Sequence, residues 1–254
     1  MASESHAGFS ISSFFKDNNI STVFTLCGGH ISPILVGCES EGINIIQVRD
    51  EASAVFAADA TSRITDTIGV AIVTAGPGVT NTMTAIKNAQ LAQSPLLLIG
   101  GAAATLLKGK GSLQDIDQLS LMKPHVKSAT SVKRCRDIIP VLHNAINRAV
   151  SDVPGPVFVE LPIDLLYPEE MIREQHLSQV SSDSFVNKVF KWYVEQHLKN
   201  VFSKKKSVII PRKKNIKNAS QSAIDKAAII IHESVRPVVL LGNQIIHNKE
   251  FLDR

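Results

Sequence analysis

The sequence is poor in aromatic residues, and it contains no long apolar run. Aromatic residues make up 5% of its 254 residues, and the 44% hydrophobic content comes mostly from Ala, Val, Ile and Leu. That mix favours packed α/β layers over a sandwich rich in aromatic residues. A membrane-spanning helix needs about 18 consecutive apolar residues, which occur nowhere, and residues 1–9 lack the pattern of a signal peptide. We therefore expect a soluble chain.

Cysteine is equally scarce. Cys27, Cys38 and Cys135 form no CxxC pair and have no ligand-like spacing with histidine. An odd number of cysteines argues for reduced thiols rather than a disulfide framework. We expect no metal site on them.

Positive charge is concentrated in one segment. Ten of the 27 Lys and Arg residues lie between residues 188 and 217, together with a single acid, Glu195. The runs at 204–206 and 212–214 would suit nucleic acid, anionic lipid or a nuclear-import receptor. Because no aromatic stacking platform or recognition motif accompanies them, a nucleic-acid partner is disfavoured, and we interpret the segment as a solvated linker.

Short β-branched runs alternate with helical patterns over the first 165 residues. Strands are predicted at 22–26, 43–48, 68–74, 96–100, 126–132 and 157–161, and helices at 32–40, 51–63, 79–93 and 137–151. Strands that alternate with helices predict an α/β fold with a doubly wound, mainly parallel sheet of about six strands.

The alternation stops after residue 168. This predicts one domain at 1–168, then a helix (186–202) and the basic linker within 169–221. Residues 222–254 contain a predicted helix at 223–234 and a strand at 237–241. We interpret them as the truncated start of a second α/β domain, because so few residues cannot close a core of their own.

Two of the predicted strands end in segments with unusual residues, at the sheet edge where ligands gather in open α/β folds. After the first strand comes Gly28-Gly29-His30, which predicts either a tight turn with a surface histidine or a backbone that can approach a flat ligand. After the second comes Asp50-Glu51. Asp50 is expected to cap the next helix, and Glu51 lies in a first turn that favours acids. A carboxyl group beside the Ala-rich turns that follow is also suited to proton transfer.

The third predicted strand runs into the sequence TAGPGVTN at 74–81. A Gly-Pro-Gly turn at the start of a helix leaves backbone amides free, and Asn81 lies in the following turn. Alone, such a turn has modest specificity.

The glycine pair, the helix-opening glutamate and TAGPGVTN, in that order and spacing, resemble the N-terminal, pyrimidine-binding domain of the thiamine diphosphate-dependent enzymes. This superfamily includes acetolactate synthase, pyruvate decarboxylase and benzoylformate decarboxylase. The resemblance covers about residues 8–168, including 94–101, 113–118 and 155–164, and more weakly 222–254. The sequence segments FTLCGGHISP, VFAADATSRIT and VELPIDLLYP are similar to those of the animal acetolactate synthase-like lyases that act on 2-hydroxyacyl-CoA.

The resemblance implies roles for particular residues. Glu51 would hydrogen-bond a pyrimidine nitrogen of thiamine diphosphate, and proton exchange there promotes the tautomer that activates the cofactor. His30 and Gln114 would contact the substrate as further catalytic residues, although the family often has Glu where Asp115 follows here. The cofactor-binding residues would be Glu51, Gly29, Gly76, Pro77, Gly78 and Asn81.

The same family holds the diphosphate through Mg²⁺ on a GDG motif that is followed by Asn-Asn. The sequence has no GDG, and its one Asn-Asn pair, Asn18-Asn19, precedes the first predicted strand. We therefore expect this chain to contact only the pyrimidine half of the cofactor and to be inactive alone. Mg²⁺ and the diphosphate would come with a diphosphate-binding domain of another subunit in a dimer or tetramer. The resemblance also implies the endoplasmic reticulum membrane, although no anchor occurs in this sequence.

Three functions follow from the resemblance. The first is the N-terminal part of a lyase that cleaves 2-hydroxyacyl-CoA to formyl-CoA and a shortened aldehyde. The second is an acetolactate synthase-type carboligase that acts on 2-oxo acids. The third is a non-catalytic partner of full-length subunits. A dinucleotide binder is disfavoured because the G-x-G-x-x-G fingerprint and its distal acid are absent.

Overall fold

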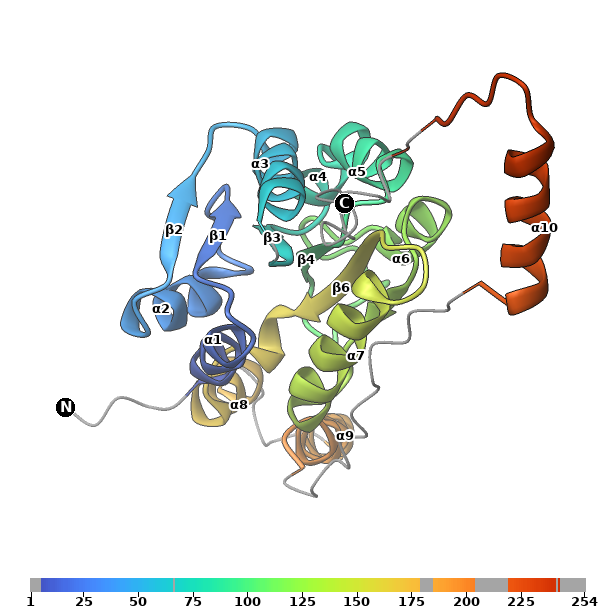
Figure 1. Cartoon of the computed structure of the whole chain (residues 1–254). Helices are drawn as coiled ribbons and strands as arrows, with labels where there is room; N and C mark the ends of the chain where they lie inside the picture. The colour runs from blue at the N-terminus through green and yellow to red at the C-terminus, as the bar shows by residue number, and fades with distance from the viewer. Residues whose placement is uncertain (1–5, 66, 179–184, 204–218, 241, 243–254) are drawn as a thin grey trace.

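The computed structural model describes residues 6–65, 67–178, 185–203, 219–240 and 242 (Figure 1). Within these residues a single six-stranded sheet has the order β2-β1-β3-β4-β6-β5, and every neighbouring pair is parallel. The strands are β1 (Thr22–Thr25), β2 (Asn44–Gln47), β3 (Gly69–Val73), β4 (Leu96–Ala102), β5 (Ala129–Ser131) and β6 (Pro156–Pro162). The predicted α/β fold with a doubly wound parallel sheet is confirmed.

The three central strands are completely buried. The sequences of β3, β4 and β6 are GVAIV, LLLIGGA and PVFVELP, and all their residues are buried. Such continuous apolar runs are typical of parallel strands that helices cover on both faces. Ile72, Ile99 and Val159 belong to one core cluster, whereas Val73, Leu98 and Phe158 belong to the cluster on the opposite face. The outer strand β2 has no fully buried residue.

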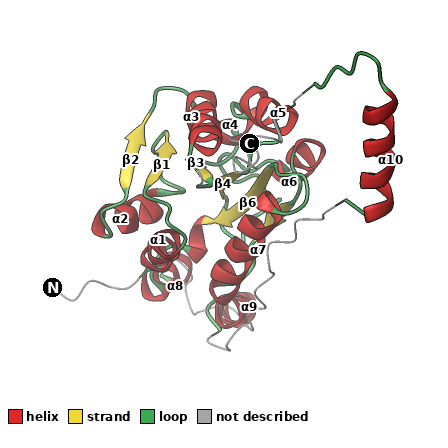
Figure 2. Ribbon diagram, viewed as in Figure 1, coloured by secondary structure: helices red, strands yellow, loops and turns green. Residues whose placement is uncertain are grey.

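Helices cover the two faces (Figure 2). On one face, α1, α2 and α7 contribute buried residues to the first cluster, and on the other α3, α5 and α6 contribute to the second. Their bounds are α1 (Ala7–Asp17), α2 (Ser32–Ser40), α3 (Glu51–Ile64), α4 (Pro77–Thr80), α5 (Met83–Leu91), α6 (Gln118–Met122) and α7 (Ile138–Val150). Single 3₁₀ turns lie at Lys123–His125, Cys135–Asp137 and Ile163–Leu165.

Several predicted elements need correction. The helix predicted at 79–93 is divided into α4 and α5, and between them the backbone NH of Thr82 bonds the carbonyl of Val79 (3.1 Å), three residues back, as in a turn. The strand predicted at 126–132 is shorter, since only β5 pairs with β6. Helices α1, α6 and α8 (Glu169–Leu177) were not predicted.

Beyond the sheet, two further helices are α9 (Phe185–Val201) and α10 (Gln221–Glu233). Their first and last residues lie within two residues of the helices predicted at 186–202 and 223–234. The strand predicted at 237–241 is wrong over residues 237–240, which are irregular and exposed because no sheet edge pairs with them. The basic runs at 204–206 and 212–214 lie outside the described residues. Among the helices that the structure describes, none combines the length and hydrophobicity needed to cross a membrane.

Candidate functional site

The candidate site lies at the carboxyl ends of β1 and β3. The strand after β1 in the sequence, β2, pairs with one edge of β1, and β3 pairs with the other. The chain therefore leaves β1 toward β2 on one side and leaves β3 toward β4 on the other. Such a topological switch point is the usual ligand position in this type of sheet. The segments that follow β1, β2 and β3 meet here.

Glu51 is the first residue of α3 and is 6% exposed. The preceding residue, Asp50, caps the helix by accepting a hydrogen bond from the backbone NH of Ala52 (2.8 Å), as predicted. Asn81 donates from Nδ2 to Glu51 Oε2 (3.0 Å). The other oxygen, Oε1, accepts no hydrogen bond from the described residues. The carboxylate is thus fixed through one oxygen and has the other available.

Gly78 keeps the space beside that free oxygen open. A Cβ atom added to Gly78 would lie 3.5 Å from Glu51 Oε1 and 2.7 Å from Thr74 Cγ2. On the other side of Thr74, a Cβ added to Gly28 would lie 2.7 Å from Thr74 Cβ. Real Cβ atoms essentially never approach so closely, so both glycines are required for the turns to close around Thr74.

His30 contacts the same threonine. Its Nδ1 lies 3.2 Å from Thr74 Oγ1, and the side chain is half-buried. Burial lowers the pKa of His30 below its usual value, because an imidazolium loses hydration there. The turn after β1 therefore holds the His30 ring against Thr74, which directly follows β3, rather than leaving a freely exposed surface histidine.

Gly76 and Gln114 are packed together by their backbones. Gly76 has a positive φ of 59°, which favours glycine, and an added Cβ would lie 2.8 Å from the carbonyl oxygen of Gln114. Gln114 is itself in the left-handed region at φ 62°. The loop that follows β4 therefore returns to the Gly-Pro-Gly turn and brings Gln114 to the edge of the site.

The description of one protein-family model reads "Thiamine pyrophosphate enzyme, N-terminal TPP binding domain", and this model matches residues 6–121. These residues include all of the predicted site. Residues 6–121 of the chain belong to the family of N-terminal TPP-binding domains of thiamine pyrophosphate enzymes.

Among curated proteins, the chain is 48% identical to 2-hydroxyacyl-CoA lyase 2 of Danio rerio over 241 residues and 46% identical to that of Homo sapiens over 247. These matches cover 94% and 96% of this chain but 39% of each relative, so the chain spans about two fifths of their length. It is also 43% identical to an acetolactate synthase large subunit of Mycobacterium tuberculosis over 159 residues, which is 63% of this chain and 29% of that protein.

The predicted site residues of this thiamine pyrophosphate-binding domain divide into two groups. Glu51, Asn81 and Gly78 are brought together, and His30 and Gln114 adjoin them through Thr74 and Gly76. Gly29 and Pro77 are exposed, and nothing lies within 4 Å of a Cβ added to Gly29. The cofactor and substrate roles of all the predicted site residues remain predictions.

Gln118 was not singled out from the sequence, although its amide ties three segments together. Its Oε1 accepts from the backbone NH of Gly76 (2.8 Å), and its Nε2 donates to the carbonyl of Gly101 (3.1 Å) and to Glu160 Oε1 (2.8 Å). Glu160 is completely buried and also pairs with Lys108. Gln118 thus holds the Gly-Pro-Gly turn against β4 and β6. In the sequence it is marked only by its place at the end of the family-like stretch 113–118.

Metal ligands are not gathered at this site. Across the described ranges, no three His, Cys, Asp or Glu side chains come together in a way that could hold a metal ion. The three cysteines are free thiols, and burial raises the pKa of Cys38 and that of Cys135 to about 12 each.

Proposed function

We propose that this chain is the pyrimidine-binding part of a thiamine diphosphate-dependent lyase that cleaves 2-hydroxyacyl-CoA to formyl-CoA and a shortened aldehyde. The proposal is supported by the names of the relatives that match 94–96% of the chain. One observation carries the cofactor assignment. Glu51 is a nearly buried carboxylate at the topological switch point of the sheet, with one oxygen fixed by Asn81 and the other without a hydrogen bond from the described residues.

The residues present fit the pyrimidine half of thiamine diphosphate. A ring nitrogen needs a hydrogen-bond partner, and Glu51 Oε1 is an unused acceptor, or a donor when protonated. The glycine at position 78 leaves that oxygen uncovered. We propose that Gly29, Gly76 and Pro77 shape the surrounding surface with Asn81.

When bound, thiamine diphosphate supplies an electron sink for carbon–carbon cleavage. The contribution of this chain is to hold and move one proton at Glu51 Oε1. The hydrogen bond from Asn81 fixes the orientation of the carboxylate, and buried Ala54 and Val55 in the next turn of α3 limit access of water. His30 and Gln114 would then contact the substrate.

The remaining parts of the active site would come from outside this chain. We propose that the diphosphate and Mg²⁺ are bound by a domain of another subunit, so that the active enzyme is a dimer or tetramer. In the family those contacts are carried by a GDG motif and a following Asn-Asn pair. The 254 residues contain no GDG, and their one Asn-Asn pair lies between α1 and β1, ahead of the whole site.

The proposal can be tested in a chimera in which residues 1–254 replace the matching region of the Danio rerio relative. We expect formyl-CoA formation from a 2-hydroxyacyl-CoA, and a loss of at least ~100-fold in kcat for Glu51→Gln, because the variant keeps the size of the side chain and removes its proton. Glu39→Gln, an exposed acid on α2, is the matched control and should be unchanged. The 254-residue chain alone should form no product.

A carboligase of the acetolactate synthase type is the second candidate, because of the 43% identity to the mycobacterial protein. The same chimera separates the two functions. Acetolactate from pyruvate without formyl-CoA would replace the lyase proposal, and full activity of Glu51→Gln would overturn the assignment of the proton-transfer residue. A chimera that folds, binds thiamine diphosphate and forms neither product would favour a non-catalytic partner.

A further inference from the structure

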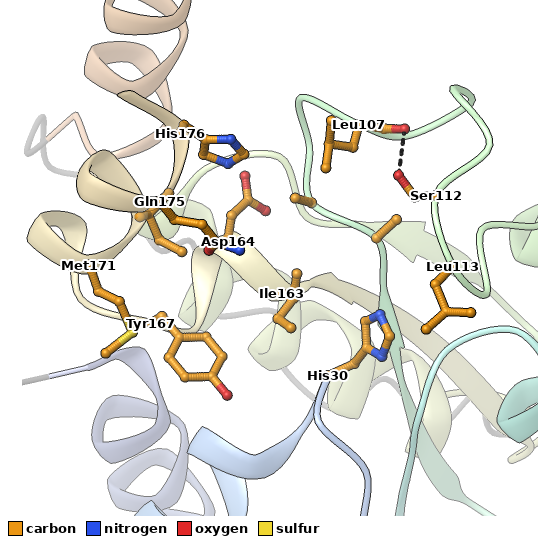
Figure 3. A pocket seen from close by; sticks show the side chains of 13 residues that line it. His30, Leu107, Ser112, Leu113, Ile163, Asp164, Tyr167, Met171, Gln175 and His176 are labelled. Carbon is orange, nitrogen blue, oxygen red and sulfur yellow. Dashed lines mark hydrogen bonds between the residues drawn. The ribbon is translucent and has the colours of Figure 1, made fainter. Parts of the chain in front are cut away.

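An apolar pocket of about 500 Å³ adjoins the candidate site. Its walls come from the loop that follows β4, from the turn that follows β6, and from α8. Figure 3 shows His30 and Leu113 on one side, and Met171, Gln175 and His176 of α8 on the other. The volume is in the range of small-molecule sites.

The walls of the pocket are mainly aliphatic. Ala104 and Leu107 lie in the loop after β4, Ile163 lies in the turn after β6, and Met171 and Ile172 lie on α8. Leu113 reaches the same pocket although it is 81% exposed. When an apolar ligand covers a large, exposed aliphatic side chain, the apolar surface is removed from water, and this favours binding.

The one buried carboxylate in the wall already has its hydrogen-bond partners. Asp164, which is 1% exposed, accepts from the backbone NH of Thr105 (3.0 Å) and from its hydroxyl (2.5 Å). It therefore does not demand a cation from the ligand. The aliphatic part of the pocket surface is suited to hydrocarbon. Further polar groups in the lining come from His30, Ser112, Tyr167, Gln175 and His176.

His30 links this pocket to the residues around Glu51. It lines the pocket and also bonds Thr74, which Gly78 packs against beside Glu51. A ligand in the pocket that has a polar head at His30 would place that head on the side of the pocket where His30 contacts Thr74, while its tail extends toward α8.

We propose that this pocket binds the hydrocarbon chain of the 2-hydroxyacyl substrate, with the hydroxyl-bearing end at His30 and the tail against Leu107, Ile163 and Met171. This inference rests on the proposed lyase function and names the part of the chain that sets acyl-chain preference. The probe is a series of free 2-hydroxy fatty acids: 2-hydroxyhexanoate, 2-hydroxydecanoate and 2-hydroxytetradecanoate.

Methionine methyl NMR on the 254-residue chain locates the probe, without any cofactor. The sequence contains four Met residues, of which Met171 lies in the pocket, whereas Met83 and Met122 belong to the core cluster on the opposite face of the sheet. We expect 2-hydroxydecanoate to shift the Met171 signal and to leave those of Met83 and Met122 in place. Calorimetry should show affinity that rises about fourfold per methylene until the pocket is filled.

Two variants test the walls. Ala104→Phe fills the pocket and should weaken 2-hydroxydecanoate binding by at least ~10-fold. Leu113→Gln removes apolar surface from the pocket and should weaken binding roughly threefold to tenfold. Because Leu113 is exposed, the substitution should not disturb folding. Leu91→Gln is the matched control, because Leu91 is also exposed (73%) but lies on α5 outside the pocket. It should bind as the unmodified chain does.

The pocket assignment is overturned if the Met171 signal does not move, if affinity is independent of chain length, or if Leu113→Gln and Leu91→Gln behave alike. Should Ala104→Phe fail to fold, Leu113→Gln decides. These results are independent of the lyase assay. Lyase activity in the chimera without fatty-acid binding in this pocket would overturn the pocket alone, and binding without lyase activity would overturn the proposed reaction alone.

Discussion

Helices α9 and α10 both follow the sheet, and the sequence predicts each to within two residues, yet their surroundings differ completely. α9 buries Val194, Leu198 and Val201, whereas no residue of α10 is buried. In Figure 1, α9 lies beneath α7, while α10 stands away from the sheet. Apolar periodicity therefore identifies a helix but does not show whether that helix has a surface to pack against.

The contacts of α9 are specific. Val194 and Leu198 form a cluster with Leu106 and with Ile172 of α8, the helix that closes the apolar pocket. His197 Nε2 lies 2.7 Å from the hydroxyl of Thr105, which in turn bonds Asp164. Because these partners follow β4 and β6, α9 fastens the pocket wall to the sheet.

Within the described part of the chain, α10 is held by local interactions alone. Ser220 caps it by accepting from the backbone NH of Ala223 (3.3 Å), and Gln221 bonds Asp225 (2.8 Å). Ile229, Ile230 and Ile231 are each more than half exposed. A 13-residue helix without tertiary packing is marginal in water, so we expect α10 to open far more readily than α9.

The largest difference should appear in limited proteolysis. Lys226 of α10 should be cut by trypsin at least ~100-fold faster than Lys191 or Lys199 of α9, because cleavage requires local unfolding and α9 is held by packing. Mass spectrometry of early fragments measures this. Equal rates at the two helices would show that the contacts of α9 contribute little to its protection.

A pair of matched substitutions should give the next largest effect. Leu198→Ala removes buried surface and should lower the free energy of unfolding by about 2–4 kcal/mol. Ile230→Ala, at a side chain that is 66% exposed, should change it by less than ~0.5 kcal/mol. Urea unfolding followed by the fluorescence of Trp192, the single tryptophan and a residue of α9, measures both. If Leu198→Ala has no effect, α9 is not an integral part of the domain.

The same contrast explains what the sequence could predict. The central strands were predicted because their apolar runs are local and their burial on two faces follows from the alternation with helices. Glu51 could be placed because its position at a helix start is also local. The role of Gln118 could not be predicted, since it depends on Gly76, Gly101 and Glu160, which come from three other segments.

Short elements were missed for a related reason. Helix α8 has only one buried residue, Ile172, and α6 has five residues, so neither shows a full period of apolar positions. The pocket was missed with α8, because its walls come from segments as far apart as Ala104 and Met171. Only the folded chain brings them together.

The smallest expected difference between α9 and α10 lies in the pH dependence of their stability. Burial lowers the pKa of His197 below 6.5, and nearby His176 and Lys110 lower it further, against the negative charge of Asp164, which raises it. The folded chain then binds fewer protons than the unfolded chain at pH values between the lowered pKa of His197 and 6.5. This contribution to stability is present in full above the unfolded pKa and is lost as pH falls through the folded value.

NMR titration of the His197 ring should give a midpoint below 6.5, and hydrogen exchange in α9 should speed up over the same pH interval. His197→Gln keeps an NH donor that can reach Thr105 but has no titrating group, so its exchange in α9 should lose this pH dependence after correction for intrinsic rates. Exchange in α10, where no buried histidine is involved, should follow intrinsic rates throughout. An unchanged pH profile in His197→Gln would assign the effect to another group. The protonation of His197 would then have no part in holding α9 against the pocket wall.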